Sequence, residues 1–262
     1  MTVIKQGDFI WYELLTGDIA AAEDFYGKVV GWEAYDPNHP GMEYHILKTQ
    51  HGEVAGVMAL TEEMKGNGAR PCWMGYIAVD DVDASAKAIE AAGGSIHVQP
   101  QDIPDVGRFA FVTDPQGVMF YIMKSLEETS TAFAATEPMV GHCAWNELST
   151  TDPEAAKSFY GAHFGWTQDG EMDMGALGKY QFLKVRSGSH ALGAVMPKMP
   201  EMPMAAWTYY FRVPDIDAAV ATITAEGGTI LQKPMEIPGG DFSMNAMDPQ
   251  GAAFALVGSR GA

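Results

Sequence analysis

The chain has 262 residues, of which 47% are hydrophobic and 19% are charged, so it is long enough for two domains that each bury an apolar core. Acidic residues outnumber basic ones by 34 to 16, and the resulting net charge of −18 argues against a nucleic-acid partner, whose phosphates are neutralised by Lys and Arg. The sequence lacks a long apolar run and a signal-peptide pattern, and its two cysteines suggest no disulfide framework, so we expect a cytoplasmic protein without a membrane span.

The first predicted elements are a strand and a helix. Residues 9–15 are typical of a strand, and Asp18 is placed to cap a helix whose apolar positions recur at helical spacing. Gly31 is placed to end that helix. Two β-rich segments follow, at 44–49 and 54–60. This series predicts a βαβββ unit.

A second series of the same kind comes next. Residues 73–79 predict a strand, and Asp81 is placed to cap a helix that Gly93 ends. Further strands are predicted near 95–99, 108–112 and 118–123. The sequence Asp114-Pro-Gln-Gly117 predicts a tight turn between the last two strands.

The whole pattern then occurs again at a fixed offset of 134 positions (145 minus 11). Twelve of the 22 residues in 11–32 are identical to their counterparts in 145–166, and Trp73 matches Trp207. A repeat of this length indicates duplicated domains rather than a solenoid.

The repeat predicts a boundary in the middle of the chain. Copy one is expected over residues 1–124 and copy two over residues 139–262. Residues 125–138 are rich in Ser, Thr and Ala and end in proline, which predicts an exposed linker. We therefore expect an α+β protein with two βαβββ units in each copy.

The order and spacing of these motifs resembles the vicinal oxygen chelate superfamily, which includes glyoxalase I, bleomycin-resistance proteins, fosfomycin-resistance enzymes and extradiol dioxygenases. The likeness rests on Asp18…Phe25-Tyr26…Gly31-Trp32, Val79–Ala84 and Asp114–Gly117, and on their counterparts at 152–166, 213–218 and 248–251. It is strongest to tandem glyoxalase-like proteins with W-x-E-L at the start of each half. The resemblance implies that paired βαβββ units curl their sheets around a cavity.

The resemblance also implies where a metal would bind. In metal-using members, one ligand stands seven residues before the helix-capping Asp, and a Glu stands seven residues after the Asp of D-P-x-G. The corresponding residues here are Trp11, Met74, Tyr121, Trp145, Thr208 and Ala255. None is the His, Glu, Gln or Asp that such a site requires. We therefore expect no cofactor; the alternative is a divalent metal on unconventional ligands, among them Glu13, His45 and Glu147.

Strand alternation predicts which other side chains share the face of those positions. The resulting candidates for ligand binding are Trp11, Tyr76, Tyr121, Trp145, Thr208, Tyr210 and Arg212. Copy two has Ala253 and Ala255 on its last strand, so we expect it to hold the roomier pocket. The alternative is that all of these are core residues, with Arg212 paired to Glu147.

Glu13 and Glu147 lie between apolar residues on the first strand of each copy. A buried carboxyl group has a raised pKa, which would suit a general acid or base. The alternative is a hydrogen bond, for example from a tryptophan N–H, that holds the sheet. Their presence in both copies slightly favours this structural role.

These residues support three hypotheses of function. The first is a protein that binds a small organic molecule in a sheet-lined cavity without the superfamily's usual metal. The second is a glyoxalase-related lyase, isomerase or dioxygenase with a non-standard metal or acid–base site. The third is a partner-binding protein that uses its acidic surface. We expect a monomer or homodimer in which the two domains pack as a pseudo-dimer.

Overall fold

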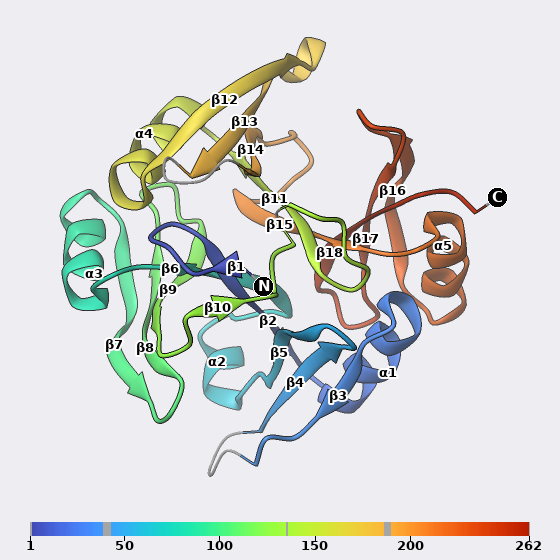
Figure 1. Ribbon diagram of the computed structural model, residues 1–262, viewed down its shortest axis with the longest axis horizontal. Coiled ribbons are helices and arrows are strands. Elements are labelled where there is room, and N and C mark those ends of the chain that lie inside the picture. The colour runs from blue at the N-terminus through green and yellow to red at the C-terminus, as the bar shows by residue number, and fades with distance from the viewer. Residues whose placement is uncertain (1, 39–42, 135, 186–189, 262) are drawn as a thin grey trace. The chain divides into compact units, whose positions relative to one another are not determined.

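The computed structural model describes residues 2–38, 43–134, 136–185 and 190–261. Copy one contains two βαβββ units in succession (Figure 1). The first consists of β2 (Phe9–Thr16), α1 (Ile19–Val30), β3 (Glu33–Tyr35), β4 (Tyr44–Thr49) and β5 (Gly52–Ala59). After the short α2 (Glu62–Gly66), the second consists of β6 (Cys72–Ala78), α3 (Val82–Ala91), β7 (Ser95–Ile103), β8 (Gly107–Thr113) and β9 (Met119–Ser125).

Copy two has the same element order. Its first unit consists of β11 (Cys143–Thr150), α4 (Pro153–Phe164), β12 (Trp166–Asp173), β13 (Lys179–Val185) and β14 (Ala191–Pro197), with a 3₁₀ turn η1 (Gly175–Leu177) between β12 and β13. Its second unit consists of β15 (Ala206–Arg212), α5 (Ile216–Ala225), β16 (Thr229–Glu236), β17 (Phe242–Met247) and β18 (Ala253–Gly258). The predicted α+β class with paired βαβββ units is confirmed.

Each copy contributes one mixed sheet. Within the described residues, the strand order is β3-β4-β5-β2-β6-β9-β8-β7 in copy one and β12-β13-β14-β11-β15-β18-β17-β16 in copy two. The pairs β2/β5, β6/β9, β11/β14 and β15/β18 are parallel, whereas the hairpin neighbours are antiparallel. The helices cover these strands: α3 lies against β7 and β8, and α5 lies against β16 and β17 (Figure 1).

The predicted helix starts are confirmed by their caps. The carboxylates of Asp18 and Asp152 each accept a hydrogen bond at 3.0 Å from the backbone N–H three residues on. Helix α1 ends at Gly31, whose φ of 87° is left-handed, a conformation that glycine adopts without the strain a side chain would cause. Helix α3 is different, because it ends at Ala91, two residues before the predicted Gly93.

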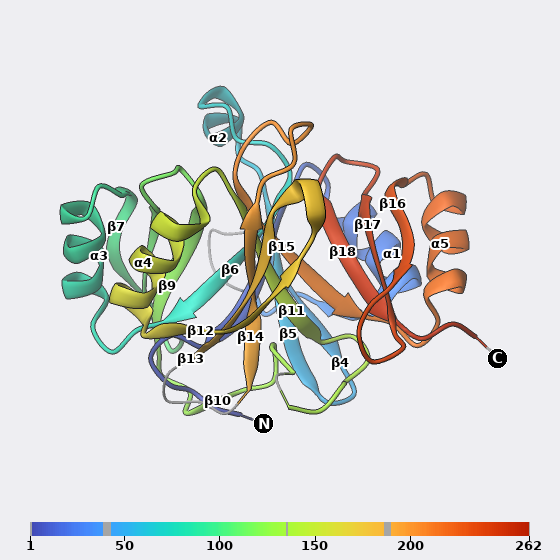
Figure 2. The ribbon, with the colours of Figure 1, turned by 90° about the horizontal axis from the view of Figure 1, so that it is seen from above.

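Chain contacts divide the molecule into two compact units, called unit 1 and unit 2, which are different from the βαβββ units. Each of the two combines halves of both copies. Unit 1 comprises residues 1–10, 75–130 and 145–208. Unit 2 comprises residues 11–74, 131–144 and 209–262. In unit 2, α1 of copy one and α5 of copy two lie side by side, as Figures 1 and 2 show.

The motifs that mark the repeat hold these halves together. In unit 2, the Tyr26 hydroxyl donates to the Asp248 carboxylate at 3.1 Å and accepts from Trp73 Nε1 at 2.9 Å. In unit 1, the Tyr160 hydroxyl makes the equivalent bonds, donating to the Asp114 carboxylate at 3.2 Å and accepting from Trp207 Nε1 at 3.2 Å. Copy one and copy two therefore bind each other within each unit.

The segment predicted as a linker is not wholly exposed. It contains the short β10 (Thr129–Ser130), which pairs with β1 (Thr2–Val3). Ala132 and Phe133 are buried, with 0% and 6% exposure. The prediction of an exposed linker is wrong at these two residues, because their apolar side chains join the core.

Candidate ligand-binding site

The first-strand candidates of copy one form a cluster in unit 2. Trp11 and Glu13 lie on β2, and Trp11 Nε1 donates to the hydroxyl of Tyr44 on β4 at 2.9 Å. Glu13 is 3% exposed. Burial and then the charge of Glu13 raise the pKa of Tyr44 well above its ordinary value. Glycine is required at position 56, because a Cβ there would clash with the Tyr44 hydroxyl.

Copy two repeats this cluster in unit 1. Trp145 Nε1 donates to the Tyr180 hydroxyl at 2.7 Å, and that hydroxyl donates to a carboxylate oxygen of Glu147 at 2.7 Å. The sequence analysis anticipated a hydrogen bond from Trp to Glu but missed the tyrosine between them. The signal was present, since Tyr44 is the first residue of β4 and Tyr180 is the second residue of β13, the corresponding strand of copy two.

Two other groups near the copy-one cluster do not extend it. Cys72 is held as a neutral thiol, because burial and then the charge of Glu13 raise its pKa to about 11. His45 is hydrogen-bonded to Glu23 of α1. Since neighbouring strand residues point to opposite faces, His45 faces away from Tyr44. Glu13 on β2 is in one row with Gly56 and Ile46, so Glu13 and His45 are on opposite faces of the sheet and do not assemble the alternative metal site.

The second half of copy one has an aromatic face in unit 1. Tyr76 on β6 and Tyr121 on β9 are paired residues, and their rings stack at 4.2 Å with an interplanar angle of 14°. Phe111 on β8 lies beside them, with its ring 5.0 Å from that of Tyr121. These predicted candidates are brought together, and they fill the face with rings.

The second half of copy two has a polar face in unit 2. Tyr210 on β15 pairs with Ala255 on β18. Arg212, two residues further along β15, forms an ion pair with Asp241 at 2.6 Å, so its partner is Asp241 and not the Glu147 of the core-residue alternative. Thr208 is half-buried on the same strand but is grouped with unit 1.

The side chains at the six superfamily ligand positions do not fit a divalent metal. Indole has no free lone pair, and the N–H groups of Trp11 and Trp145 are both donated to tyrosine hydroxyls. Ala255 has no donor atom, and Tyr121 is stacked on Tyr76. Among the residues that the structure describes, no group of three or more His, Cys, Asp or Glu could hold a metal.

The chain matches a family model in both copies. The model of the Glyoxalase/Bleomycin resistance protein/Dioxygenase superfamily matches residues 9–122 and again residues 139–256. In the described part of the chain, no helix is long and apolar enough to cross a membrane.

Curated relatives align along almost the whole chain. "Putative glyoxylase CFP32" of Mycobacterium tuberculosis (strain CDC 1551 / Oshkosh) is 35% identical over 257 residues, which cover 97% of this chain and 95% of the relative. "Anthracycline biosynthesis protein DnrV" of Streptomyces peucetius is 29% identical over 273 residues, which cover 98% of this chain and 95% of that protein.

Solved structures share the fold at low sequence identity. The Mn(II)-bound glyoxalase from Novosphingobium aromaticivorans has a TM-score of 0.64 and 17% identity, with 100% of this chain and 84% of that chain covered. The 2,2',3-trihydroxybiphenyl 1,2-dioxygenase from Sphingomonas wittichii strain RW1 has a TM-score of 0.65 and 13% identity, with 98% and 91% covered. At these identities the solved structures support the fold alone, and the chemistry has to be argued from the residues of the site.

Proposed function

Because the chain belongs to the Glyoxalase/Bleomycin resistance protein/Dioxygenase superfamily, we propose that it binds a small organic molecule in a sheet-lined cavity without the superfamily's usual metal. The observation that carries this proposal is the pair of tryptophans at the first-strand ligand positions. Each donates its only polar hydrogen to a tyrosine hydroxyl, at 2.9 Å from Trp11 and 2.7 Å from Trp145. An indole ring offers an apolar face to an organic ligand and no ligand atom to a metal.

In this proposal, Glu13 and Glu147 position the tryptophan–tyrosine pairs rather than transfer protons. Glu147 accepts the Tyr180 hydroxyl at 2.7 Å, and Tyr180 in turn accepts the Trp145 N–H. A half-buried carboxylate is stabilised by such a partner, because desolvation without one is costly. The repeated arrangement in both copies supports a structural role, since one reaction would not require two sets.

A glyoxalase-related lyase, isomerase or dioxygenase reaction is the second candidate. It is favoured by the burial of Glu13, which is 3% exposed, and by the 35% identity to a relative named as a glyoxylase. Such a reaction would use Glu13 or Glu147 as the acid–base group or as part of a non-standard metal site.

One experiment separates the two candidates. The protein is purified without chelators, its metal content is measured by elemental analysis, and its intact mass is compared under native and denaturing conditions. We expect an organic mass that is released on denaturation and far less than one metal per chain. One equivalent of metal per chain, lost in Glu13→Gln or Glu147→Gln but kept in the exposed control Glu127→Gln, would overturn the proposal.

The proposal extends to the localisation, the partners and the oligomeric state of the protein. We place the protein in the cytoplasm, where its free Cys72 and Cys143 stay reduced. The net charge of −18 supports a partner that is not nucleic acid. The protein is a monomer or homodimer, which analytical ultracentrifugation would distinguish.

A further inference from the structure

The second half of each copy presents the same three-strand face, which allows a comparison position by position. In copy one, Tyr76, Tyr121 and Phe111 form one row across β6, β9 and β8. In copy two, Tyr210, Ala255 and Asn245 form the equivalent row across β15, β18 and β17. The two rows correspond at the repeat offset of 134 positions.

The next row differs in the same direction. In copy one, Phe109 on β8 pairs with Met123 on β9. In copy two, Ser243 on β17 pairs with Val257 on β18, which in turn pairs with Arg212 on β15. Copy two thus replaces two phenylalanines and one tyrosine by Ser, Asn and Ala, and it adds an arginine where copy one has Ala78.

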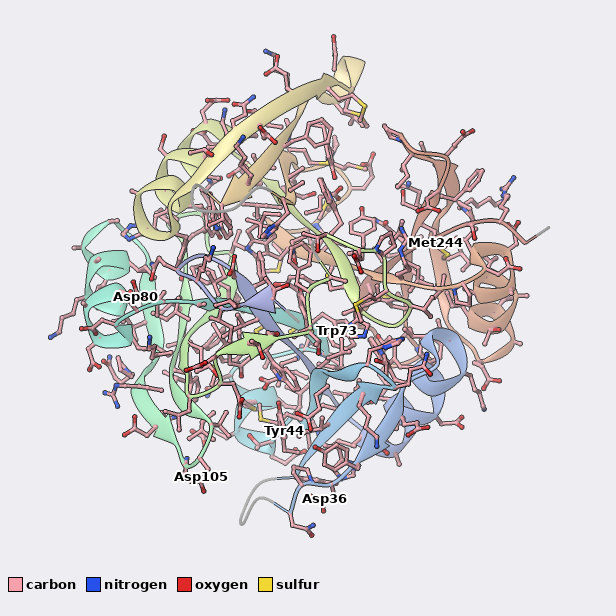
Figure 3. The ribbon with its side chains drawn as sticks, viewed as in Figure 1. Asp36, Tyr44, Trp73, Asp80, Asp105 and Met244 are labelled. Atoms are coloured by element: carbon pink, nitrogen blue, oxygen red, sulfur yellow. The ribbon has the colours of Figure 1, made fainter. Side chains whose placement is uncertain are left out.

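These replacements leave two buried polar atoms without partners. Among the described residues, Arg212 Nε and Asn245 Oδ1 are buried and make no hydrogen bond. One is a donor and the other an acceptor. Asn245 follows Met244 on β17, and Arg212 shares a row with Ser243, so strand alternation places both side chains on the face opposite the fully buried Met244, which Figure 3 labels. A buried polar atom without a partner costs about 1–3 kcal/mol, so this pair indicates a site whose partner is a bound molecule.

The backbone holds Arg212 in place. Its N–H donates to the carbonyl of His142 at 2.9 Å, and its carbonyl accepts from Gly141 N–H at 2.8 Å. Its guanidinium is fixed by Asp241 through Nη2 at 2.6 Å, which leaves Nε–H unused. The donor is therefore oriented before any ligand arrives, which lowers the entropic cost of binding.

The charge of this site selects against ions. The Arg212 and Asp241 side chains are 16% and 30% exposed and form an ion pair, so the guanidinium is already neutralised. An anionic ligand would have to compete with Asp241, and a cationic ligand would meet the Arg212 charge. The site therefore fits an uncharged molecule.

We propose that Arg212 and Asn245 form a polar subsite in copy two for an uncharged ligand that carries both an acceptor and a donor, such as an amide, a lactam or a hydroxy ketone. The ligand's acceptor takes the Arg212 Nε–H, and the ligand's donor binds Asn245 Oδ1. This subsite rests on the proposed small-molecule function and assigns it to copy two.

The test uses three probes of nearly equal shape. Benzamide carries both an acceptor and a donor, acetophenone carries only the acceptor, and benzoate is charged. Protein-observed NMR titrations of the full chain should give the order benzamide, acetophenone, benzoate, from tightest to weakest. Asn245→Ala should weaken the affinity for benzamide by about tenfold, because a single hydrogen bond is lost, and leave the affinity for acetophenone nearly unchanged.

Two further variants separate this subsite from general apolar binding. The triple variant S243F/N245F/A255Y gives copy two the aromatic face that copy one already folds with, and it should lose benzamide binding. Phe111→Asn in copy one is the matched control and should gain none, because Ala78 supplies no donor. Circular dichroism and thermal unfolding confirm that each variant is folded.

The outcomes separate the subsite from the proposed function. Equal benzamide affinity in the wild type and the triple variant, or no shift at any probe concentration, would overturn the subsite. Equal affinity for benzamide and acetophenone would also overturn it. An organic mass released from the purified triple variant would show that the proposed function survives while the copy-two subsite fails.

Discussion

At the scale of single residues, the tyrosine between tryptophan and glutamate explains how the half-buried carboxylate of Glu147 is tolerated on the first strand of copy two. The Tyr180 hydroxyl accepts one hydrogen bond, from Trp145, and donates another, to Glu147, both at 2.7 Å. A hydroxyl can do both at once, which neither a tryptophan nor a carboxylate can. The side chain that the sequence analysis did not single out is therefore the one that connects the cluster.

Removing that hydroxyl should destabilise the fold. We expect Tyr180→Phe to lower the free energy of unfolding by about 1–3 kcal/mol, because the Trp145 N–H and the Glu147 carboxylate both lose a partner. Urea denaturation followed by circular dichroism measures the change. Tyr35→Phe, on an exposed tyrosine, is the matched control and should change stability less. Equal losses in the two variants would contradict the bridging role of Tyr180.

His142 makes stability depend on pH. It is fully buried, its Nδ1 lies 2.6 Å from the carbonyl of Thr131, and its Nε2 lies 2.9 Å from the hydroxyl of Thr49. Burial lowers its pKa below the ordinary value of 6.5, and the charge of His51 adds to this effect. The unfolded chain therefore takes up a proton at a higher pH than the folded chain does.

The contribution of His142 to the free energy of unfolding decreases as the pH falls. The contribution of His142 is fully present above pH 6.5 and is lost as the pH falls below that value. Burial raises the pKa of Asp8 and of Asp114 from 3.8, and these groups act with the opposite sign at lower pH. We expect the unfolding free energy of the wild type to fall between about pH 7 and pH 5. Burial also lowers the pKa of His163, so His142→Gln should reduce this dependence and leave the part that His163 contributes. The double variant His142→Gln, His163→Gln should flatten it further.

At the scale of elements, the glutamine of each D-P-Q-G turn forms hydrogen bonds with the residue that caps the start of a helix in the other copy. In unit 1, Gln116 Oε1 accepts from the Asp152 N–H at 2.8 Å, and Gln116 Nε2 donates to the Asp152 carbonyl at 2.9 Å. In unit 2, Gln250 Nε2 donates to the Asp18 carbonyl at 2.8 Å. The motif that marks the family therefore holds the start of α4 and of α1 through hydrogen bonds to their capping residues.

The two glutamines should contribute differently to the free energy of unfolding. Gln116 also accepts from the hydroxyls of Thr150 and Thr151, at 2.6 and 2.5 Å. Gln116→Ala should therefore lower the free energy of unfolding by about 1–2 kcal/mol, and Gln250→Ala by less, because fewer bonds are lost. Thermal and urea unfolding of both variants measure the difference. A larger loss in Gln250→Ala would contradict this reading of the turns.

At the scale of the whole molecule, each compact unit contains residues from both copies. Tyr26 of copy one bonds to Asp248 of copy two, and Tyr160 of copy two bonds to Asp114 of copy one. Trp32 Nε1 donates to the Gly141 carbonyl at 2.6 Å, and Trp166 Nε1 donates to the Gly7 carbonyl at 2.8 Å. We therefore expect the association of the copies not to depend on the peptide link between them.

Cutting that link should leave the copies together. A protease site inserted after Glu137, which is exposed, would allow cleavage of the folded protein. We expect both fragments to elute together in size-exclusion chromatography, because the bonds between the copies remain. Cleaved protein carrying Tyr26→Phe and Tyr160→Phe should separate at a lower urea concentration. Fragments that elute apart without denaturant would show that the link itself maintains the association.

The sequence by itself determined the elements, because their signals are local. Asp18 and Asp152 cap helices, Gly31 ends one, and the repeat at 134 positions implies four βαβββ units. That the superfamily's ligand positions hold no His, Glu, Gln or Asp is also a matter of residue type alone. Only the tertiary structure decided which side chains meet, because Tyr180 joins Trp145 to Glu147 across 33 to 35 positions, and Arg212 reaches Asp241 rather than Glu147. Such contacts depend on strand register and on how the strands of one copy pair, which no local pattern records.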